Sequence, residues 1–193
     1  MKSVLLGNGI NIQFGGKAYS NYFIMERIRY RAKLDSYLQL FGNVLTSCEI
    51  VSILDGFVNI ANDLRNGAYD QYIDGDKGIE EAIKDFKCRY NANINASYEI
   101  MLEDWFLLVQ VFFLKNNDIT DNKTAAIQGF ERLILDAIYN GGKIQELFKK
   151  IPRKVKRFFN TYDNIFTLNY DNNLEMLTKK TVFHLHGDFS VLA

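Results

Sequence analysis

Residues 164–171 have the sequence NIFTLNYD, a short apolar run that ends in polar residues. The run 164–168 predicts a buried strand, because it is short and contains β-branched and aromatic residues. Residues 3–6 (SVLL) predict a strand that ends at the turn Gly7-Asn8-Gly9, and residues 181–185 predict another. A helix is expected between the last two strands, over 172–179. We therefore expect an α/β fold with a Rossmann-like parallel sheet.

The long segment between the first two strands has a different pattern. Apolar residues recur there at helical spacing, as at Ile79, Ile83 and Phe86. Residues 98–114 are apolar almost all round, which predicts a helix surrounded by other helices. Asn140-Gly141-Gly142 predicts the end of a helix. We expect a single domain, residues 1–193, with a large all-helical insert at 17–150 and a return to the α/β core at 151–193.

The charge composition is balanced. The 193 residues include 23 Lys and Arg and 23 Asp and Glu, so the overall charge gives no direct indication of nucleic acid. A local basic run lies at 149–157. We interpret it as a solvated helix face, because such runs usually serve solubility.

Cysteine content and apolar runs restrict the compartment. Cys48 and Cys88 are far apart, which excludes a cysteine-based zinc site and argues against a disulfide framework. The longest apolar run, 105–114, is about half as long as a membrane span, and residues 1–6 are too short for a signal peptide. We expect a cytoplasmic protein with no membrane partner.

Polar residues follow two of the predicted strands directly. The turn Gly7-Asn8-Gly9 leaves backbone amides open to a phosphate, although Ile12 stands where a dinucleotide fingerprint has its third glycine. Asn169 can both donate to and accept from a ribose hydroxyl, and Asp171 can accept from an amide or a hydroxyl. Alternatively, Asp171 caps the helix that follows. The carboxyl ends of parallel strands are where ligands bind, so we expect a nucleotide site there.

Both histidines of the chain, His184 and His186, lie beside Gly187 at the end of the third predicted strand. Imidazole can take a proton from a sugar hydroxyl near neutral pH, so one of them is a candidate general base. Strand alternation would place His184, His186 and Asp188 on one side. A metal-dependent hydrolase using these three residues is therefore an alternative.

The order of these motifs resembles that of the sirtuin-like superfamily, and within it the divergent bacterial sirtuin-like and AbiH-like proteins of phage defence. The resemblance is carried by Gly7-Asn8-Gly9, Leu168-Asn169-Tyr170-Asp171 and His186-Gly187. It implies that NAD is the substrate, that Asn169 holds the nicotinamide ribose and helps to place the attacking water, and that His186 is the base. Asp171 would contact the nicotinamide carboxamide. The residues expected to contact NAD are Gly7, Asn8, Gly9, Asn11, Asn169, Asp171 and Gly187.

The resemblance implies an NAD-hydrolysing module of an antiphage abortive-infection system, which cleaves the bond between nicotinamide and ribose without a metal. The four zinc cysteines of sirtuins are absent, which argues against protein deacylation. The later strands of such domains are missing after Gly187, so we expect either part of a longer protein or a minimal version with an incomplete site. A sensor that binds NAD or ADP-ribose without turnover, or a structural module, is the alternative. The helical insert would bind a phage-derived trigger or a partner protein, and an oligomer is expected.

Overall fold

The computed structural model describes residues 1–73, 75–116, 118–185 and 187. It divides into two compact units, the first formed by Met1–Phe23 with Ile138–Ala193 and the second by Ile24–Ala137. The second unit is shorter at both ends than the insert expected at 17–150. The arrangement of both units within one domain stays a prediction.

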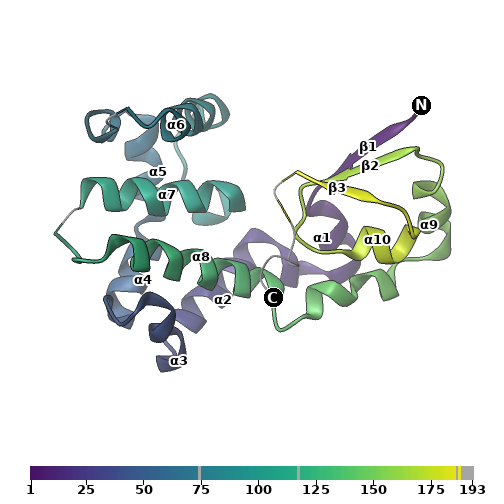
Figure 1. Ribbon diagram of the computed structural model, residues 1–193, viewed down its shortest axis with the longest axis horizontal. Coiled ribbons are helices and arrows are strands. Elements are labelled where there is room, and N and C mark those ends of the chain that lie inside the picture. Colours follow the sequence, from purple (N-terminus) through teal and green to yellow (C-terminus); the bar gives the residue numbers. More distant parts are fainter. Residues whose placement is uncertain (74, 117, 186, 188–193) are drawn as a thin grey trace. The chain divides into compact units, whose positions relative to one another are not determined.

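The first unit contains a three-stranded parallel sheet in the order β1-β2-β3 (Figure 1). Its strands are β1 (Ser3–Leu6), β2 (Asn164–Thr167) and β3 (Val182–His184). The register aligns Leu6 with Thr167 and Thr167 with His184, so the last residues of the strands lie side by side. The chain is therefore an α/β protein with the three strands that the sequence predicts.

One face of this sheet packs against short helices (Figure 1). They are α1 (Gly9–Gly15), η5 (Lys143–Lys150), α9 (Arg153–Phe159) and α10 (Asn173–Thr178), and a short helix η1 (Lys17–Tyr19) follows α1. The core between them consists of buried apolar side chains, namely Ile10, Ile151, Phe159, Ile165, Leu174, Leu177 and Val182. Burial of these side chains fixes the strands against the helices that carry the polar motifs.

The other face of the sheet is apolar and exposed. Leu5, Phe166 and Phe183 are neighbours in the register, and the rings of Phe166 and Phe183 stack with centroids 5.2 Å apart. Leu5 is 56% exposed and Phe183 is 48% exposed. In the described part of the chain, the sheet is thus covered on one face.

The second unit is helical. Its elements are α2 (Asn21–Ala32), α3 (Asp35–Leu38), η2 (Gln39–Phe41), α4 (Ser47–Asp55), α5 (Phe57–Arg65), η3 (Asp70–Tyr72), α6 (Lys77–Arg89), η4 (Ser97–Glu99), α7 (Leu102–Lys115) and α8 (Lys123–Tyr139), of which α2 and α8 extend into the first unit. Fully buried aromatic residues, including Phe41, Phe57, Trp105 and Phe130, form its core.

The helix expected over 98–114 starts later than predicted, at Leu102. Residues Ser97–Glu99 form a separate 3-10 turn, and Ile100 and Met101 are extended. The extended backbone lets the Met101 amide donate to the Tyr90 hydroxyl at 2.8 Å, a contact that a continuous helix would not make. Among the helices in the described segments, none combines the length and the apolar character that crossing a membrane requires.

Candidate functional site

The structure brings the polar motifs together at the carboxyl edge of the sheet. Gly7 follows β1, Asn169 comes two residues after β2, and His184 ends β3. The Leu168 amide continues the ladder by donating to the Leu6 carbonyl at 2.9 Å. The side-chain amide of Asn169 then donates to the Gly7 carbonyl at 3.4 Å. Segments 162 residues apart in the chain therefore form one polar edge.

The glycines of the first turn differ from those that follow. A methyl group added to Gly9 would have no atom within 4 Å, and one on Gly7 would be 3.9 Å from Leu168. Neither residue has a positive φ. In contrast, a methyl group on Gly15 would be 2.5 Å from the Tyr19 ring, and Gly16 has a φ of 82°. Packing and backbone strain thus explain Gly15 and Gly16 but leave the space beside Gly7 and Gly9 open to a ligand.

Asp171 connects the two strand ends from inside the unit. Its Oδ2 accepts from Asn11 Nδ2 at 2.7 Å, and its Oδ1 accepts from the Asn173 backbone amide at 3.1 Å and from Asn173 Nδ2 at 2.5 Å. Asp171, Asn11 and Asn173 are all buried, with exposed fractions of 3%, 3% and 1%. The bond to the Asn173 amide is the capping contact that the sequence offered as an alternative. The bond to Asn11 does not cap α10, and it fixes α1 to the end of β2.

Asn173 was not expected in the site. Its Nδ2 also donates to the Ile144 carbonyl at 2.7 Å, and its Oδ1 accepts from the Phe148 amide at 2.8 Å. It therefore holds η5 beside the start of α10. A polar residue at the start of a helix suggests capping, and the sequence carries no signal that Asn173 is buried.

Asn169 is 6% exposed and held by short contacts. Its backbone amide donates to Thr167 Oγ1 at 3.0 Å, and its carbonyl accepts from the ring of His184. Its Nδ2 is directed to Gly7, and within the described residues its Oδ1 accepts no hydrogen bond. This oxygen is an acceptor that a ligand hydroxyl could use.

The Asn8 side chain points elsewhere. Its Nδ2 donates to the Tyr19 carbonyl at 2.7 Å, which ties the turn to η1. The side chain does not cap α1, although Asn8 occupies the N-cap position. Any contact of Asn8 with a ligand would therefore use its backbone.

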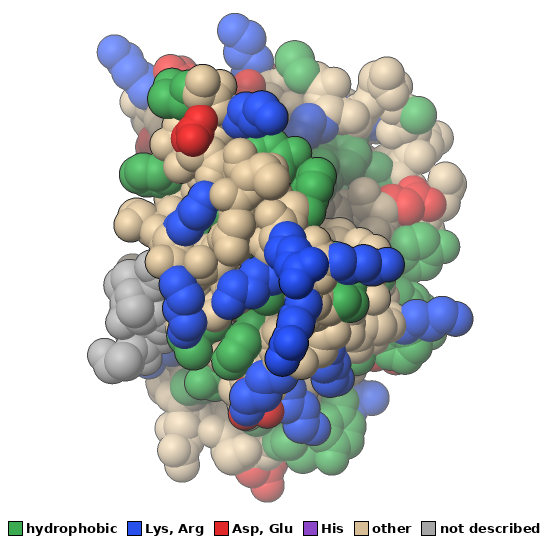
Figure 2. Space-filling view, turned by 90° about the vertical axis from the view of Figure 1, so that its right-hand side faces the viewer, with side chains coloured by type: hydrophobic (Ala, Val, Ile, Leu, Met, Phe, Trp, Pro, Cys, Tyr) green, Lys and Arg blue, Asp and Glu red, His purple; other side chains and the backbone are tan. Residues whose placement is uncertain are grey.

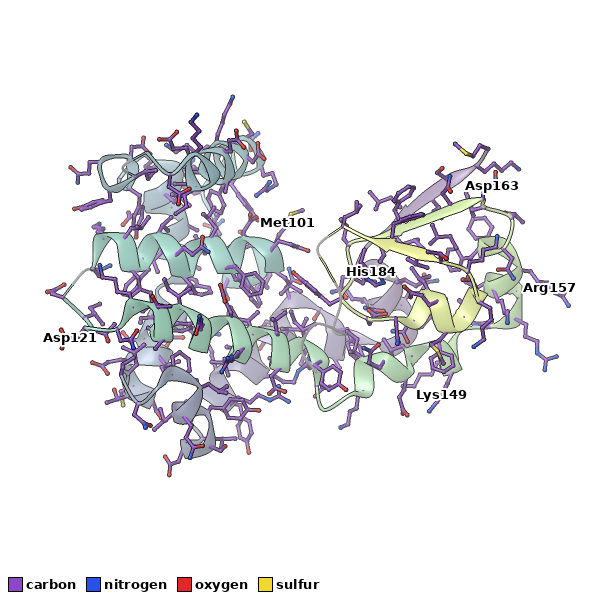
Figure 3. All side chains as sticks on the ribbon, in the orientation of Figure 1. Met101, Asp121, Lys149, Arg157, Asp163 and His184 are labelled. Atoms are coloured by element: carbon purple, nitrogen blue, oxygen red, sulfur yellow. The ribbon has the colours of Figure 1, made fainter. Side chains whose placement is uncertain are left out.

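His184 lies at the end of β3 (Figure 3), and both of its ring nitrogens make hydrogen bonds. Nδ1 lies 2.8 Å from the Asn169 carbonyl, which can only accept, so Nδ1 carries a hydrogen. Nε2 lies 2.6 Å from Glu175 Oε1, and one proton must lie between these two atoms. Glu175 lies in the first turn of α10. The pair supports the Asn169 backbone from the α10 side.

The expected base and two of the three metal-ligand candidates lie outside the described residues. His186 and Asp188 are outside the described residues, whereas Gly187 is described and has a φ of 82°. Because both nitrogens of His184 are engaged, this side chain has no lone pair free for a metal. Across the residues that can be placed, no group of three His, Cys, Asp or Glu side chains could hold a metal ion.

No protein-family model matches the chain, and neither the curated proteins nor the solved structures contain a significant match. The resemblance to sirtuin-like proteins is therefore carried by the sequence motifs alone and stays a prediction.

Proposed function

We propose that the chain is an NAD-hydrolysing module that cleaves the bond between nicotinamide and ribose. One observation carries the proposal: two side-chain bonds, Asn169 to Gly7 and Asn11 to Asp171, join the two motifs at the carboxyl edge of a parallel sheet. This edge is where open α/β sheets bind nucleotides. The open space beside Gly7 and Gly9 supports close approach of a phosphate to the backbone.

The side chains at this edge suit the chemistry of the bond. Cleavage passes through a ribose with oxocarbenium character, and preoriented negative groups stabilise such a state. The Asp171 carboxyl group accepts hydrogen bonds only from N–H groups, and within the described residues it has no ion pair. A nicotinamide ring carries a positive charge in NAD, so a buried anion near it favours binding. Asn169 Oδ1 would accept from a ribose hydroxyl.

The remaining roles come from the resemblance to sirtuin-like defence proteins. By that resemblance His186 takes the proton from the ribose hydroxyl, and the protein acts in the cytoplasm in an abortive-infection system. The Rossmann-like relationship of the sheet belongs to the same proposal. The helical unit would then receive the trigger.

The direct test is release of nicotinamide from NAD by the full chain, measured by chromatography. We expect Asn169→Ala and His186→Ala each to reduce the rate at least about 100-fold, because each removes a polar group that acts on the ribose. The matched control is Asn164→Ala, which removes the same side chain at the opposite end of β2. Release that survives both site substitutions would refute the assignment.

Binding of NAD and ADP-ribose, measured by calorimetry on the same proteins, separates the alternative. Binding that requires Asn169 but is never followed by release would replace the hydrolase by a sensor. Loss of activity on adding a chelator would instead favour a metal-dependent hydrolase.

A further inference from the structure

The balanced net charge of the chain conceals a separation of charge between the two units. The first unit contains eleven Lys and Arg against five Asp and Glu, whereas the second contains twelve against eighteen. The first unit therefore has an excess of six positive charges. Two of its five acidic residues, Asp171 and Glu175, are engaged within the candidate site.

Most of this excess lies on one surface, which we call the basic face. It consists of Lys149, Lys150, Arg153, Lys154, Lys156 and Arg157, from the end of η5 and from α9. Five of these side chains are exposed and Lys156 is half-buried. Figure 2 shows Lys and Arg side chains gathered on the surface of this unit that faces the viewer. No acidic residue interrupts the sequence 149–157.

The cations of the basic face are scarcely neutralised by the protein. Lys149 forms an ion pair with Glu146 at 2.6 Å, and this hydrogen bond lowers the pKa of Glu146. For the other five, the described part of the chain holds no ion pair. Lys180 lies close by, with its Nζ donating to the Asn160 and Tyr162 carbonyls just beyond α9. The basic face thus presents a local positive potential to solvent.

An aromatic ring stands among these cations. Phe158 follows Arg157 in α9 and is 53% exposed. Its ring packs edge-on against Tyr162, with centroids 5.4 Å apart, and against Phe159 at 5.5 Å. These contacts hold one edge of Phe158 and leave part of it open. An exposed aromatic ring beside Lys and Arg side chains is the combination that binds unstacked bases and phosphates together.

We propose that the basic face binds single-stranded nucleic acid. The cations would neutralise backbone phosphates, and Phe158 would stack on a base. A membrane surface fits less well, because an interfacial helix needs a broad apolar side. In α9 the other aromatic residue, Phe159, is 5% exposed and packs into the core.

The basic face lies apart from the candidate nucleotide site. Figure 3 shows Arg157 and Lys149 on a different side of the first unit from His184. Binding at the basic face can therefore be measured without NAD and judged separately from the proposed hydrolysis.

The test is fluorescence anisotropy of a labelled 20-nucleotide single strand of mixed sequence, titrated with the full chain at several salt concentrations. We expect the triple variant Lys154→Gln, Lys156→Gln, Arg157→Gln to bind at least about tenfold more weakly, with a salt dependence of log Kd shallower by about two. The control removes three exposed lysines of the second unit, Lys33→Gln, Lys77→Gln and Lys84→Gln, and should bind as the unchanged protein does. Equal binding by both variants would overturn the proposal.

Two further comparisons identify the partner. Phe158→Ala should weaken binding of the strand about tenfold while leaving the salt dependence unchanged, because stacking releases no counterions. A duplex of the same sequence should bind more weakly than the strand. Preference for the duplex, or binding of phosphatidylserine vesicles without binding of the strand, would overturn the proposal, as would binding of neither.

Discussion

Two carboxylates, Asp171 in the first unit and Asp104 in the second, are equally buried but differently held. Each residue is 3% exposed. Asp104 forms an ion pair with Arg89 and accepts from the Tyr90 hydroxyl at 2.7 Å. Asp171 accepts from the amides of Asn11 and Asn173. Within the described residues, Asp104 is therefore paired with a cation. The Asp171 carboxyl group is held in place by amide donors and has no cation beside it.

The two arrangements serve different ends. The Tyr90 hydroxyl donates to Asp104 and accepts from the Met101 amide, which joins the end of α6 to the start of α7. The polar groups of this network form hydrogen bonds with one another. The network therefore stabilises the helical unit and leaves few donors or acceptors for a ligand. Asp171 leaves a negative potential at the sheet edge, which a cationic ring can compensate. Burial alone thus does not distinguish a structural acid from a candidate site residue, but the charge of its partners does.

Replacing each acid by alanine is expected to give the largest difference between the units. Asp171→Ala leaves three N–H groups of Asn11 and Asn173 without their acceptor in the core. A buried donor without an acceptor costs about 1–3 kcal/mol, so the free energy of unfolding should fall by about 3 kcal/mol or more. Asp104→Ala should cost about 1–2 kcal/mol. The reason is that the Arg89 side chain is 40% exposed and can be hydrated.

Urea denaturation with two probes measures these losses. Trp105 is the single tryptophan of the chain and reports on the second unit. Hydrogen exchange at the fully buried Ile165 reports on the first unit. A larger loss for Asp104→Ala than for Asp171→Ala would mean that the ion pair, and not the amide network, is the more strongly coupled to the fold.

Two glycines, one in each unit, test the same difference between a structural residue and a candidate site residue. The expected effect on stability is intermediate in size. In α8, a methyl group on Gly129 would overlap the ring of Phe41, which is fully buried. Gly129→Ala should therefore cost about 1–3 kcal/mol of stability through overpacking. Gly9→Ala meets open space, and its stability should be unchanged or higher by up to about 1 kcal/mol.

The function should respond in the opposite way. Gly9→Ala is expected to weaken NAD binding at least about tenfold, because the methyl group occupies the space proposed for a phosphate. Gly129→Ala should bind NAD normally at temperatures where it is folded. Calorimetry on both variants checks this, and normal binding of NAD by Gly9→Ala would remove the turn from the proposed site.

The elements of this fold that depend on local sequence could be predicted. The three strands, the polar residues at their carboxyl ends and the stop at Asn140-Gly141-Gly142, where all three residues have positive φ, follow from short-range patterns. The fold class needs only these. The start of α7 could not be predicted, because the tertiary bond between Met101 and Tyr90 overrides the apolar periodicity.

The connections within the site depend on three-dimensional packing. Asn11 and Asp171 are 160 residues apart, and their bond requires the register of β1 on β2. The pairing of His184 with Glu175 requires α10 to pack back toward the end of β3. The sequence shows the basic run at 149–157. The excess of positive charge in the first unit, however, can be counted only once the bounds of the two units are known. Sequence patterns locate polar residues, whereas their partners follow from the fold.

The smallest expected effect concerns Tyr90, which completes the network of Asp104. Burial, with a further contribution from the hydrogen bond to Asp104, raises the pKa of Tyr90 above its ordinary value of 10.0. Its contribution to stability is therefore fully present below about pH 10 and is lost as the pH rises above that value, because only the unfolded chain then ionises. Tyr90→Phe should cost about 1 kcal/mol at pH 7 and make stability fall less between pH 10 and pH 11.

Urea denaturation followed by Trp105 fluorescence at pH 7 and at pH 10.5 measures this difference. The control is Tyr30→Phe, at a tyrosine that is 67% exposed, which should leave both values unchanged. The free energy of unfolding could instead fall by the same amount between pH 7 and pH 10.5 in Tyr90→Phe and in the unchanged protein. This result would show that the contact with Asp104 does not keep the Tyr90 hydroxyl protonated. The negative charge of Asp104 would then be compensated by Arg89 alone, as in a simple ion pair. Tyr90 would not contribute to the network described above.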